Sequence, residues 1–497
     1  MLLTLATACT AAFSALCAAT VAAFLVLVMI PRLHSPVRAW LRPRAVERVE
    51  SGLVLVAAAQ RRQHPWLTWL FVHSSHSVSV TFYASFLPIL FWLGFPELGR
   101  NLVFLMTLAL YVGNAIKDLV CSPRPLGVPY GKQRLRLLGA QGEEAELNAK
   151  EYGLPSSHTL NSLCLNYFAV WYLYDRQLIT AGTTLLLYGV VALWVVWIAA
   201  SRLYLGLHTP VDILAGAVAG LAVLVCFIAV EGLLPRWLFS GPRAVLHAAL
   251  ASLLLLRLHP RPLEHTPSFQ FSTSFMGAMF GLVVGIAWMS PYAHQPGVQL
   301  AQLWSGDRRL LGSRLLWAAR RLALGFAVVG TLKEGSRAAF KAGLPFVYRF
   351  FPLAIRRLWQ PPVHNLWRPA KAAAAAAAAA AETAKAAQQG SNGRHHGAPP
   401  PAGGSAQEEQ RQGGEQAALR RRGAQPAGSA AAAGNSRRSG GSRGQPPSGD
   451  ARLLAALPHN EHGMPWDVDV TSRFFAYAGI GLAVGGVSPR ILDALGW

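Results

Sequence analysis

The sequence predicts an all-α, multi-pass transmembrane bundle, and two observations predict it. Of the 497 residues, 53% are hydrophobic and only 14% are charged, whereas soluble domains carry roughly 25% charged residues. Apolar runs of about 20 residues, the length of helix that crosses a bilayer, recur through the first two thirds of the chain. The composition also excludes collagen, coiled-coil and disulfide-rich secreted proteins.

Six spans are predicted before residue 232. The first apolar run, 2–30, has no basic residue before it and is longer than the apolar core of a signal peptide, so we expect a retained span. The segment 31–75 is basic and too broken to cross a bilayer. Its arginines are Arg32, Arg38, Arg42, Arg44, Arg48, Arg61 and Arg62. Five further apolar runs follow at about 76–95, 101–119, 158–174, 179–200 and 210–230.

The rest of the chain is less regular. Runs near 244–256 and 270–290, with a weaker one at 319–332, predict additional hydrophobic helices within 233–370. Residues 371–465 contain ten consecutive alanines and then mostly Gly, Gln, Arg, Pro and Ser, a composition that cannot bury a core and therefore predicts a disordered linker. The C-terminal hydrophobic segment, 466–497, fits either a last span or a helix lying in the membrane interface.

The formal net charge of +22 would suggest nucleic-acid binding in a soluble protein. Here the Lys and Arg residues stand mostly at the ends of apolar runs and in the linker, where they contact lipid headgroups or solvent. No basic recognition helix or aromatic RNA-binding motif is present. We therefore expect the bilayer as partner and no nucleic acid. The five cysteines show neither zinc spacing nor a disulfide framework.

Three clusters of polar residues stand at the ends of the predicted spans. They comprise Lys117 and Arg124 after the third span, Ser156, Ser157 and His158 at the start of the fourth, and Arg202, His208 and Asp212 between the fifth and sixth. Because consecutive spans alternate in direction, both connections emerge on the same side of the membrane. We therefore expect the three clusters to meet at one membrane surface.

These residue types suit the handling of a phosphate. Lys117, Arg124 and Arg202 offer positive charge and donors that match phosphate oxygens. Ser156 and Ser157 stand where a helix begins, and unpaired backbone N–H groups there favour an anion.

The remaining residues suit nucleophilic catalysis. His208 and Asp212 are four residues apart and share one face if the sixth helix starts at His208, so the carboxylate can fix the imidazole tautomer and leave the other ring nitrogen to attack. His158 is then the acid that protonates the leaving alkoxide. No dense carboxylate cluster is present to hold magnesium, so we expect no metal and no cofactor.

Each cluster alone also has a structural interpretation. Lys117 and Arg124 are typical of membrane-end anchors, Pro-Ser-Ser before a helix is usually a cap, and a His–Asp pair can simply stabilise a helix start. Ionisable residues near the membrane nevertheless carry a free-energy cost, which favours a functional role for them. The conjunction of all three clusters favours a phosphate site.

The clusters resemble the three-part signature of the type-2 phosphatidic acid phosphatase superfamily. Its elements are Lys-x6-Arg-Pro, Pro-Ser-x-His and Ser-Arg-x5-His-x3-Asp, and all three match within 117–212. The resemblance implies a six-helix phosphatase core, and the core with the catalytic motifs is expected at 76–232. The residues around the motifs, such as Lys-Glu-Tyr-Gly-Leu-Pro-Ser-Ser-His at 150–158, are similar to the long-chain-base (sphingosine) 1-phosphate phosphatases and the plant lipid phosphate phosphatases of the delta type. The usual superfamily glycine of the second motif is Ser157 here.

The resemblance also implies roles. The phosphate-binding residues would be Lys117, Arg124, Ser156, Ser157 and Arg202. His208 would form a phosphohistidine, Asp212 would orient it, and His158 would be the acid in a metal-independent hydrolysis of sphingoid base 1-phosphates. The alternatives are a broader phosphatase acting on phosphatidic acid or a polyprenyl diphosphate, a lipid phosphotransferase, and a non-catalytic transporter or scaffold that binds anionic lipid.

The resemblance places the catalytic face in the lumen of the endoplasmic reticulum. The charge pattern disagrees. If 2–30 crosses the membrane once, the seven arginines within 32–62 lie on the catalytic side, which the positive-inside rule assigns to the cytosol. We expect the lumenal placement, because several other cations on that side serve the phosphate.

Overall fold

A computed structural model describes residues 2–127, 135–139, 150–264, 266–289, 311–352, 356 and 465–496. These belong to one compact unit formed by residues 1–367 and 456–497. The regular elements within the described ranges are helices, which confirms the all-α prediction. The predicted disordered linker, 371–465, lies outside the described residues except for its last residue.

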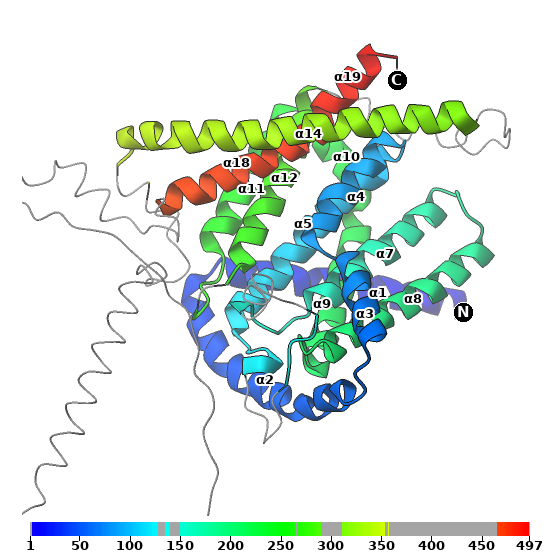
Figure 1. Ribbon diagram of the computed structural model, residues 1–497, viewed down its shortest axis with the longest axis vertical. Coiled ribbons are helices and arrows are strands. Elements are labelled where there is room, and N and C mark those ends of the chain that lie inside the picture. The colour runs from blue at the N-terminus through cyan, green and yellow to red at the C-terminus, as the bar shows by residue number, and fades with distance from the viewer. Residues whose placement is uncertain are drawn as a thin grey trace, which may run out of the picture. The chain divides into compact units, whose positions relative to one another are not determined.

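Seven helical segments are long and apolar enough to cross a membrane, which confirms a multi-pass membrane protein. They correspond to α1 (Leu2–Val28), α5 (Pro96–Val120), α8 (Ala181–Tyr204), α9 (Pro210–Val230, extended through α10 to Leu238), α12 (Ser268–Trp288), α14 (Leu311–Val347) and α18 (Trp466–Leu482, extended through η7 and α19 to Ala494). Figure 1 shows α14 and α18 running side by side, and the two helices pack together. The last apolar segment is therefore a helix packed in the bundle.

Two of the expected spans differ from the prediction. Within 76–95 the helix α4 (Val80–Trp92) has only 13 residues, about 20 Å, which is shorter than the roughly 30 Å hydrocarbon layer. The serines at 77 and 79 separate it from α3 (Pro65–His76), and Gly94 with a positive φ ends the stretch. The helix α7 (Ser157–Asp175) has 19 residues, but polar side chains such as Asn161 and Asn166 lower its mean hydropathy. It is therefore not among the seven segments that are apolar enough to cross a membrane.

Other bounds also differ from the apolar runs. The helix α11 (Pro242–Leu258) has 17 residues, whereas α14 has 37 residues and far exceeds the weak run at 319–332. Short elements complete the chain: η1 (Pro125–Gly127), η2 (Glu231–Leu233), α10 (Leu234–Leu238), η5 (Tyr348–Phe350), η7 (Ala483–Val487) and α19 (Ser488–Ala494).

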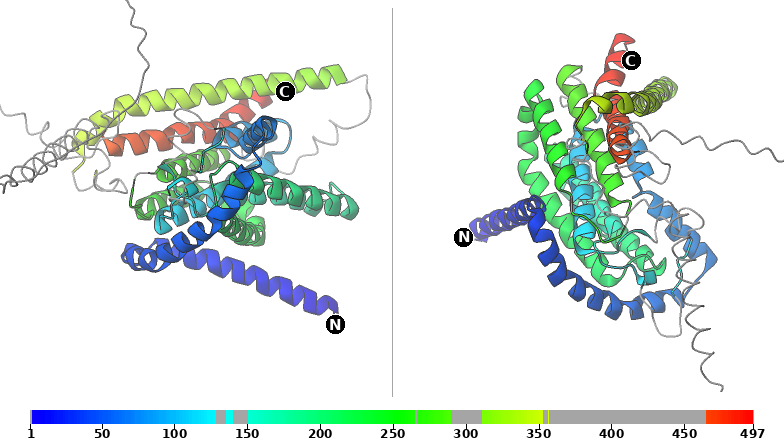
Figure 2. Two further views of the ribbon diagram at one scale, coloured as in Figure 1. Left: turned by 60° about the horizontal axis from the view of Figure 1, so that its bottom comes forward. Right: turned by 90° about the vertical axis from the view of Figure 1, so that its left-hand side faces the viewer.

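The basic segment forms a long helix that supports the end of α5. The helix α2 (Pro31–Gln60) contains Pro36 and Pro43 and curves around one end of the bundle (Figures 1 and 2). Arg38 donates from Nε to the Leu119 carbonyl oxygen at 2.8 Å, and Arg42 donates from Nε to that of Cys121 at 3.1 Å. Terminal carbonyls of a helix lack intrahelical donors. Two of the seven arginines therefore fix the end of α5 beside Lys117.

The helices that carry the three motifs pack against one another around α5. The core cluster joins α5, α7 and α9 through side chains such as Leu105, Phe168 and Val223. On α9, a Cβ at Gly216 would lie 2.6 Å from the Ser156 carbonyl oxygen. Only glycine permits this approach, which holds the start of α7 directly against the first turns of α9.

A buried ionic cluster ties the opposite ends of the same helices. Glu97 at the start of α5 accepts hydrogen bonds from Arg176 Nη2 at 2.8 Å and from Tyr172 Oη at 2.9 Å, and it lies 3.6 Å from Arg100 Nη2. Arg176 also lies 3.5 Å from Glu231, just beyond α9. The Glu97 carboxylate thus connects the start of α5 to the end of α7. Through Arg176 it is also linked to Glu231 beyond the end of α9.

Glu97→Ala is expected to destabilise the protein by about 3–5 kcal/mol, because it removes a charged partner from the buried Arg100 and from Arg176. The measurement is thermal unfolding in detergent. The matched control is Glu334→Ala, which breaks an exposed pair with Lys333 at 3.4 Å and should cost less than about 1 kcal/mol. Equal losses in the two variants would show that the cluster does not hold the helix ends.

Candidate active site

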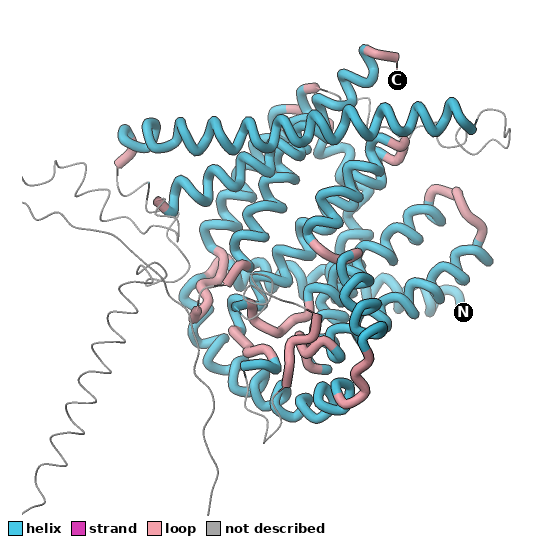
Figure 3. The backbone as a smooth tube through the Cα atoms, in the orientation of Figure 1, coloured by secondary structure: helices cyan, strands magenta, loops and turns pink. Residues whose placement is uncertain are grey.

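The connections that carry the motifs gather at one end of the bundle. Figure 3 shows the loops after α5 and α8 inside the arc of α2. A cavity of about 330 Å³ opens there. Six of the eight predicted site residues line it, namely Lys117, Arg124, Ser157, His158, Arg202 and His208. The three clusters therefore converge on one cavity in this structure, as the sequence predicts.

The other two predicted residues lie directly behind the cavity wall, fully buried. Ser156 Oγ caps α7 and accepts a hydrogen bond from Thr159 Oγ1 at 3.1 Å, while the Ser156 amide donates to the Asp212 carbonyl oxygen at 2.9 Å. Ser156 thus joins the start of α7 to α9. Its hydroxyl is engaged in the cap, whereas Ser157 and His158 face the cavity.

Asp212 also serves its own helix. Its Oδ2 accepts hydrogen bonds from the Thr209 amide at 2.7 Å and from Thr209 Oγ1 at 2.9 Å, which forms a capping box at the start of α9. The His208 Nδ1 atom lies 3.8 Å from the same oxygen. This separation is too long for a direct hydrogen bond between the imidazole and the carboxylate. Nδ1 faces the carboxylate, which leaves Nε2 as the nitrogen available to a substrate.

Two cations of the site share one carboxylate that the sequence analysis assigned no role. Lys117 Nζ lies 2.5 Å from Glu151 Oε1, and Arg124 Nη2 pairs with Glu151 Oε2. Arg124 Nε donates to the Glu151 carbonyl oxygen at 3.0 Å. Burial alone would raise the pKa of Glu151, but Lys117 and Arg124 outweigh it and hold that pKa at about 2. Glu151 is therefore ionised at any physiological pH.

The third cation is held by hydroxyl groups. Arg202 Nε donates to Ser201 Oγ at 3.1 Å, and Arg202 Nη2 contacts Ser75 Oγ. Ser75 lies on α3, more than 40 residues before the first motif in the sequence, and no sequence pattern marks it as a site residue. Asn114, Asn161 and Tyr83 also line the cavity without having been predicted.

The surroundings of His208 favour its neutral form. Burial lowers the pKa of His208 well below its usual value, and the nearby positive charges of Arg124, Lys117 and Arg202 lower it further. Glu151 opposes this shift but does not reverse it. A neutral imidazole retains the lone pair that a nucleophile needs.

The pKa shift predicts how the reactivity of His208 varies with pH. A lowered pKa keeps the imidazole unprotonated as the pH falls through 6.5, and protonation occurs only at lower pH. In a His158→Ala background, the rate of phosphate-protectable inactivation by diethyl pyrocarbonate, which attacks neutral imidazole, should stay constant from pH 7.5 to about 6. A rate that halves near pH 6.5, the ordinary histidine value, would contradict the shift.

Comparisons with known proteins agree with the motifs. The PAP2 superfamily profile matches residues 98–234. The chain is 33% identical over 322 residues to lipid phosphate phosphatase delta of Arabidopsis thaliana, covering 64% of this chain and 74% of that protein. It is 28% identical over 232 residues to a dihydrosphingosine 1-phosphate phosphatase of Saccharomyces cerevisiae, covering 45% of this chain and 53% of the yeast protein.

A third relative is sphingosine-1-phosphate phosphatase 2 of Homo sapiens, 26% identical over 230 residues, with 45% of this chain and 52% of the human protein covered. The chain thus spans about half the length of the yeast and human relatives. No solved structure matches the chain. The profile match covers all three motifs, and the plant relative, 33% identical, is matched over 74% of its length, so the chain belongs to the PAP2 superfamily.

Proposed function

We propose that this protein is a membrane phosphatase that hydrolyses long-chain sphingoid base 1-phosphates to the free base and inorganic phosphate. The observation that carries the proposal is the cavity at the end of the membrane helices, which His208 lines together with Lys117, Arg124 and Arg202. Three fixed cations are suited to a phosphate dianion and to the charge that develops when the phosphoryl group is transferred.

The proposed reaction has two steps. In the first, His208 Nε2 forms a bond to phosphorus while the bond from phosphorus to the lipid oxygen breaks, and His158 donates a proton to that oxygen. In the second, His158 takes a proton from water, the water oxygen bonds to phosphorus, and the phosphorus–nitrogen bond breaks to release phosphate. Asp212 stabilises the positive charge that His208 carries in the intermediate, from an Oδ2 atom 3.8 Å from Nδ1.

Several roles in the cavity are assigned on the same basis. Lys117, Arg124, Arg202 and the hydroxyl and backbone of Ser157 would hold the phosphate, and Ser156 would support them by capping α7. Positive side chains supply the charge stabilisation in this scheme, so no cofactor takes part in either step.

Placement supports a lipid substrate. Lys117, Arg202 and His208 stand at or next to the ends of α5, α8 and α9, which are long enough to span a bilayer. A lipid with its tail among the helices brings its phosphate to this height, whereas a soluble phosphoester gains nothing from the location. The names of the yeast and human relatives favour a sphingoid base as the lipid.

The test is an assay of purified protein in detergent against sphingosine 1-phosphate, dihydrosphingosine 1-phosphate, phosphatidic acid and a polyprenyl diphosphate. We expect the sphingoid phosphates to give the highest kcat/KM. Comparable rates on phosphatidic acid would replace the proposal by a broader lipid phosphatase. Absence of phosphate release from every lipid would favour a binding protein.

We further propose that the protein lies in the endoplasmic reticulum membrane with this cavity in the lumen. Arg38 and Arg42 lie on the side of the cavity but are engaged with the end of α5, so their charge has a structural purpose. An Asn-x-Ser/Thr acceptor introduced within 126–150 is expected to be glycosylated. An acceptor that stays unmodified there, while one on the opposite side is glycosylated, would place the cavity in the cytosol.

A further inference from the structure

The carboxylate of Glu151 occupies the centre of the candidate phosphate site. Among the described residues that line the cavity, Glu151 is the one acidic side chain. Its two carboxylate oxygens contact Lys117 and Arg124, the same two cations that a phosphate would engage. A substrate phosphate therefore has to displace this carboxylate from both partners.

The displaced carboxylate cannot move far. The Glu151 carbonyl oxygen accepts from Arg124 Nε at 3.0 Å, and the Gly153 amide donates to the Ser122 carbonyl oxygen at 2.9 Å. These bonds hold the backbone against the segment that carries Arg124. Rotation about its side-chain bonds leaves the carboxylate inside the cavity, next to the bound phosphate.

A sphingoid base 1-phosphate presents a matching charge. Its ammonium group is on the second carbon from the phosphate oxygen, so phosphate in the site brings the ammonium close to Lys117, Arg124 and Arg202. Those cations would repel it without a compensating anion. We propose that Glu151 binds the substrate ammonium and thereby selects amine-bearing lipid phosphates, an inference that rests on the function proposed above.

The test compares kcat/KM for sphingosine 1-phosphate with that for its N-acetylated form, which keeps the tail and phosphate but has no charge on nitrogen. In Glu151→Gln the preference for the amine should fall about tenfold or more, as expected for loss of a charge-assisted contact. Glu151→Asp, which keeps the charge, should restore part of it. The matched control is Glu264→Gln. The Glu264 side chain is exposed and only its backbone amide donates to Tyr152 Oη, so this variant should leave the preference unchanged.

The outcomes separate this inference from the proposed function. Equal changes on the amine and the N-acetylated lipid in Glu151→Gln would overturn the inference and make Glu151 a positioning residue for Lys117 and Arg124. A wild-type protein that hydrolyses phosphatidic acid as fast as sphingosine 1-phosphate would overturn the proposed function, whatever the variant does.

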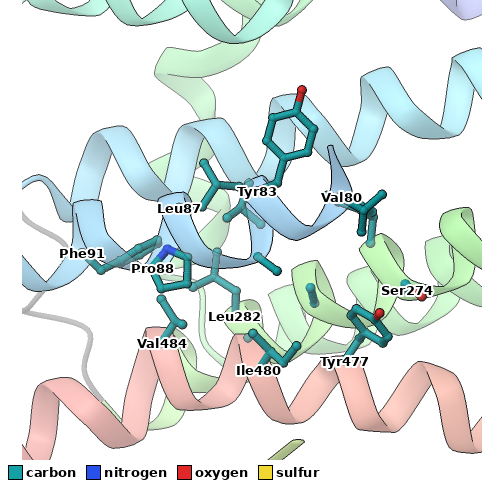
Figure 4. A pocket seen from close by; sticks show the side chains of 15 residues that line it. Val80, Tyr83, Leu87, Pro88, Phe91, Ser274, Leu282, Tyr477, Ile480 and Val484 are labelled. Carbon is teal, nitrogen blue, oxygen red and sulfur yellow. The ribbon is translucent and has the colours of Figure 1, made fainter. Parts of the chain in front are cut away.

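A second, independent observation concerns an apolar groove beside the cavity. Figure 4 shows its lining side chains, which come from α4, α12 and α18, with one residue each from α5 and η7. Val80 and Tyr83 line both this groove and the catalytic cavity. The α4 residues that line the groove extend from Val80 to Phe91, about 17 Å along the helix. Its other walls include Leu282 on α12 and Ile480 on α18.

We infer that this groove holds the hydrocarbon chain of the lipid phosphate. It lies beside the catalytic cavity, with Val80 and Tyr83 in the walls of both, and its almost wholly apolar lining suits a hydrocarbon chain. The C-terminal segment would then contribute directly to substrate binding through α18. This inference depends on a lipid phosphate as substrate and not on which lipid it is.

Ala84 offers a direct test, because it lines the groove but is exposed, so a larger side chain there fills the groove without disrupting the core. Ala84→Phe should lower the ratio of kcat/KM for long-chain over short-chain sphingoid phosphates by about tenfold, on the scale of one buried aromatic side chain. The control is Ser85→Phe, the exposed neighbour that does not line the groove. An unchanged ratio in Ala84→Phe, or an equal fall in both variants, would overturn the inference.

Discussion

His208→Ala is expected to lower the hydrolysis of every lipid phosphate by at least about a thousandfold, because the variant lacks the atom that bonds to phosphorus. His208 lies in the cavity wall among three cations, and burial with those charges lowers its pKa well below the usual value. Among the described residues of the cavity wall, His208 is the histidine with a ring nitrogen within 4 Å of a carboxylate oxygen. The measurement is phosphate release from sphingosine 1-phosphate by purified protein.

Loss of activity has meaning only if the variant is folded. The loop that carries His208 is fixed by the Thr209–Asp212 capping box and by backbone bonds to Arg202, so we expect wild-type thermal stability and membrane accumulation. His247→Ala, which alters an exposed histidine on α11, is the matched control and should keep full activity. Ordinary turnover in His208→Ala would show that the nucleophile is elsewhere.

His158→Ala is expected to slow the hydrolysis of sphingoid phosphates by about a hundredfold to ten-thousandfold, the range of general acid catalysis. The leaving group of these lipids is a primary alkoxide, which needs a proton as its bond to phosphorus breaks. His158 stands at the start of α7, in the wall of the same cavity as His208. We expect the loss to appear in kcat.

A substrate with a better leaving group shows whether His158 acts as a general acid or as a phosphate ligand. A nitrophenyl phosphate releases a stable phenolate and needs little protonation, so His158→Ala should hydrolyse it at close to the wild-type rate in the first step. The comparison is the ratio of burst-phase rates on the two substrates for wild type and variant. Equal losses on both would mean that His158 binds or positions the phosphate and does not protonate the leaving oxygen.

The convergence of the site was predictable from the sequence. The motifs stand at the ends of long apolar helices, and consecutive spans reverse direction, so Lys117, His158 and His208 had to reach one surface. Helix direction and local motif spacing decide this outcome, and both are visible in the chain. The predicted family membership follows from the same residues and is confirmed by the comparisons.

Other features of the site depend on contacts between distant residues. Ser75 reaches Arg202 only because α3 packs against α8. Arg38 and Arg42 looked like membrane-surface charge, but the curvature of α2 brings them to the end of α5. Nothing in the spacing of Glu151 shows that its carboxylate joins Lys117 and Arg124. The apolar run exceeds α4 because Val78 before the helix and Leu93 and Phe95 after it extend the apolar pattern beyond the helix ends.

The use of α18 as a groove wall was also beyond the sequence. Glycines at 277, 281 and 285 of α12 let the backbone of the C-terminal helix approach closely, and a Cβ at Gly281 would lie within 1.9 Å of the Ala478 carbonyl oxygen. This packing joins segments separated by nearly two hundred residues (Figure 1). Composition alone left the last segment undecided between a span and an interfacial helix.

The stereochemical course at phosphorus tests the phosphohistidine mechanism most directly. A substrate made chiral at phosphorus with oxygen isotopes and sulfur is hydrolysed in isotopically labelled water, and the configuration of the released thiophosphate is determined. Attack by His208 followed by attack of water inverts phosphorus twice and predicts overall retention. Net inversion would mean that water attacks the lipid phosphate in a single step, and it would remove His208 as the nucleophile.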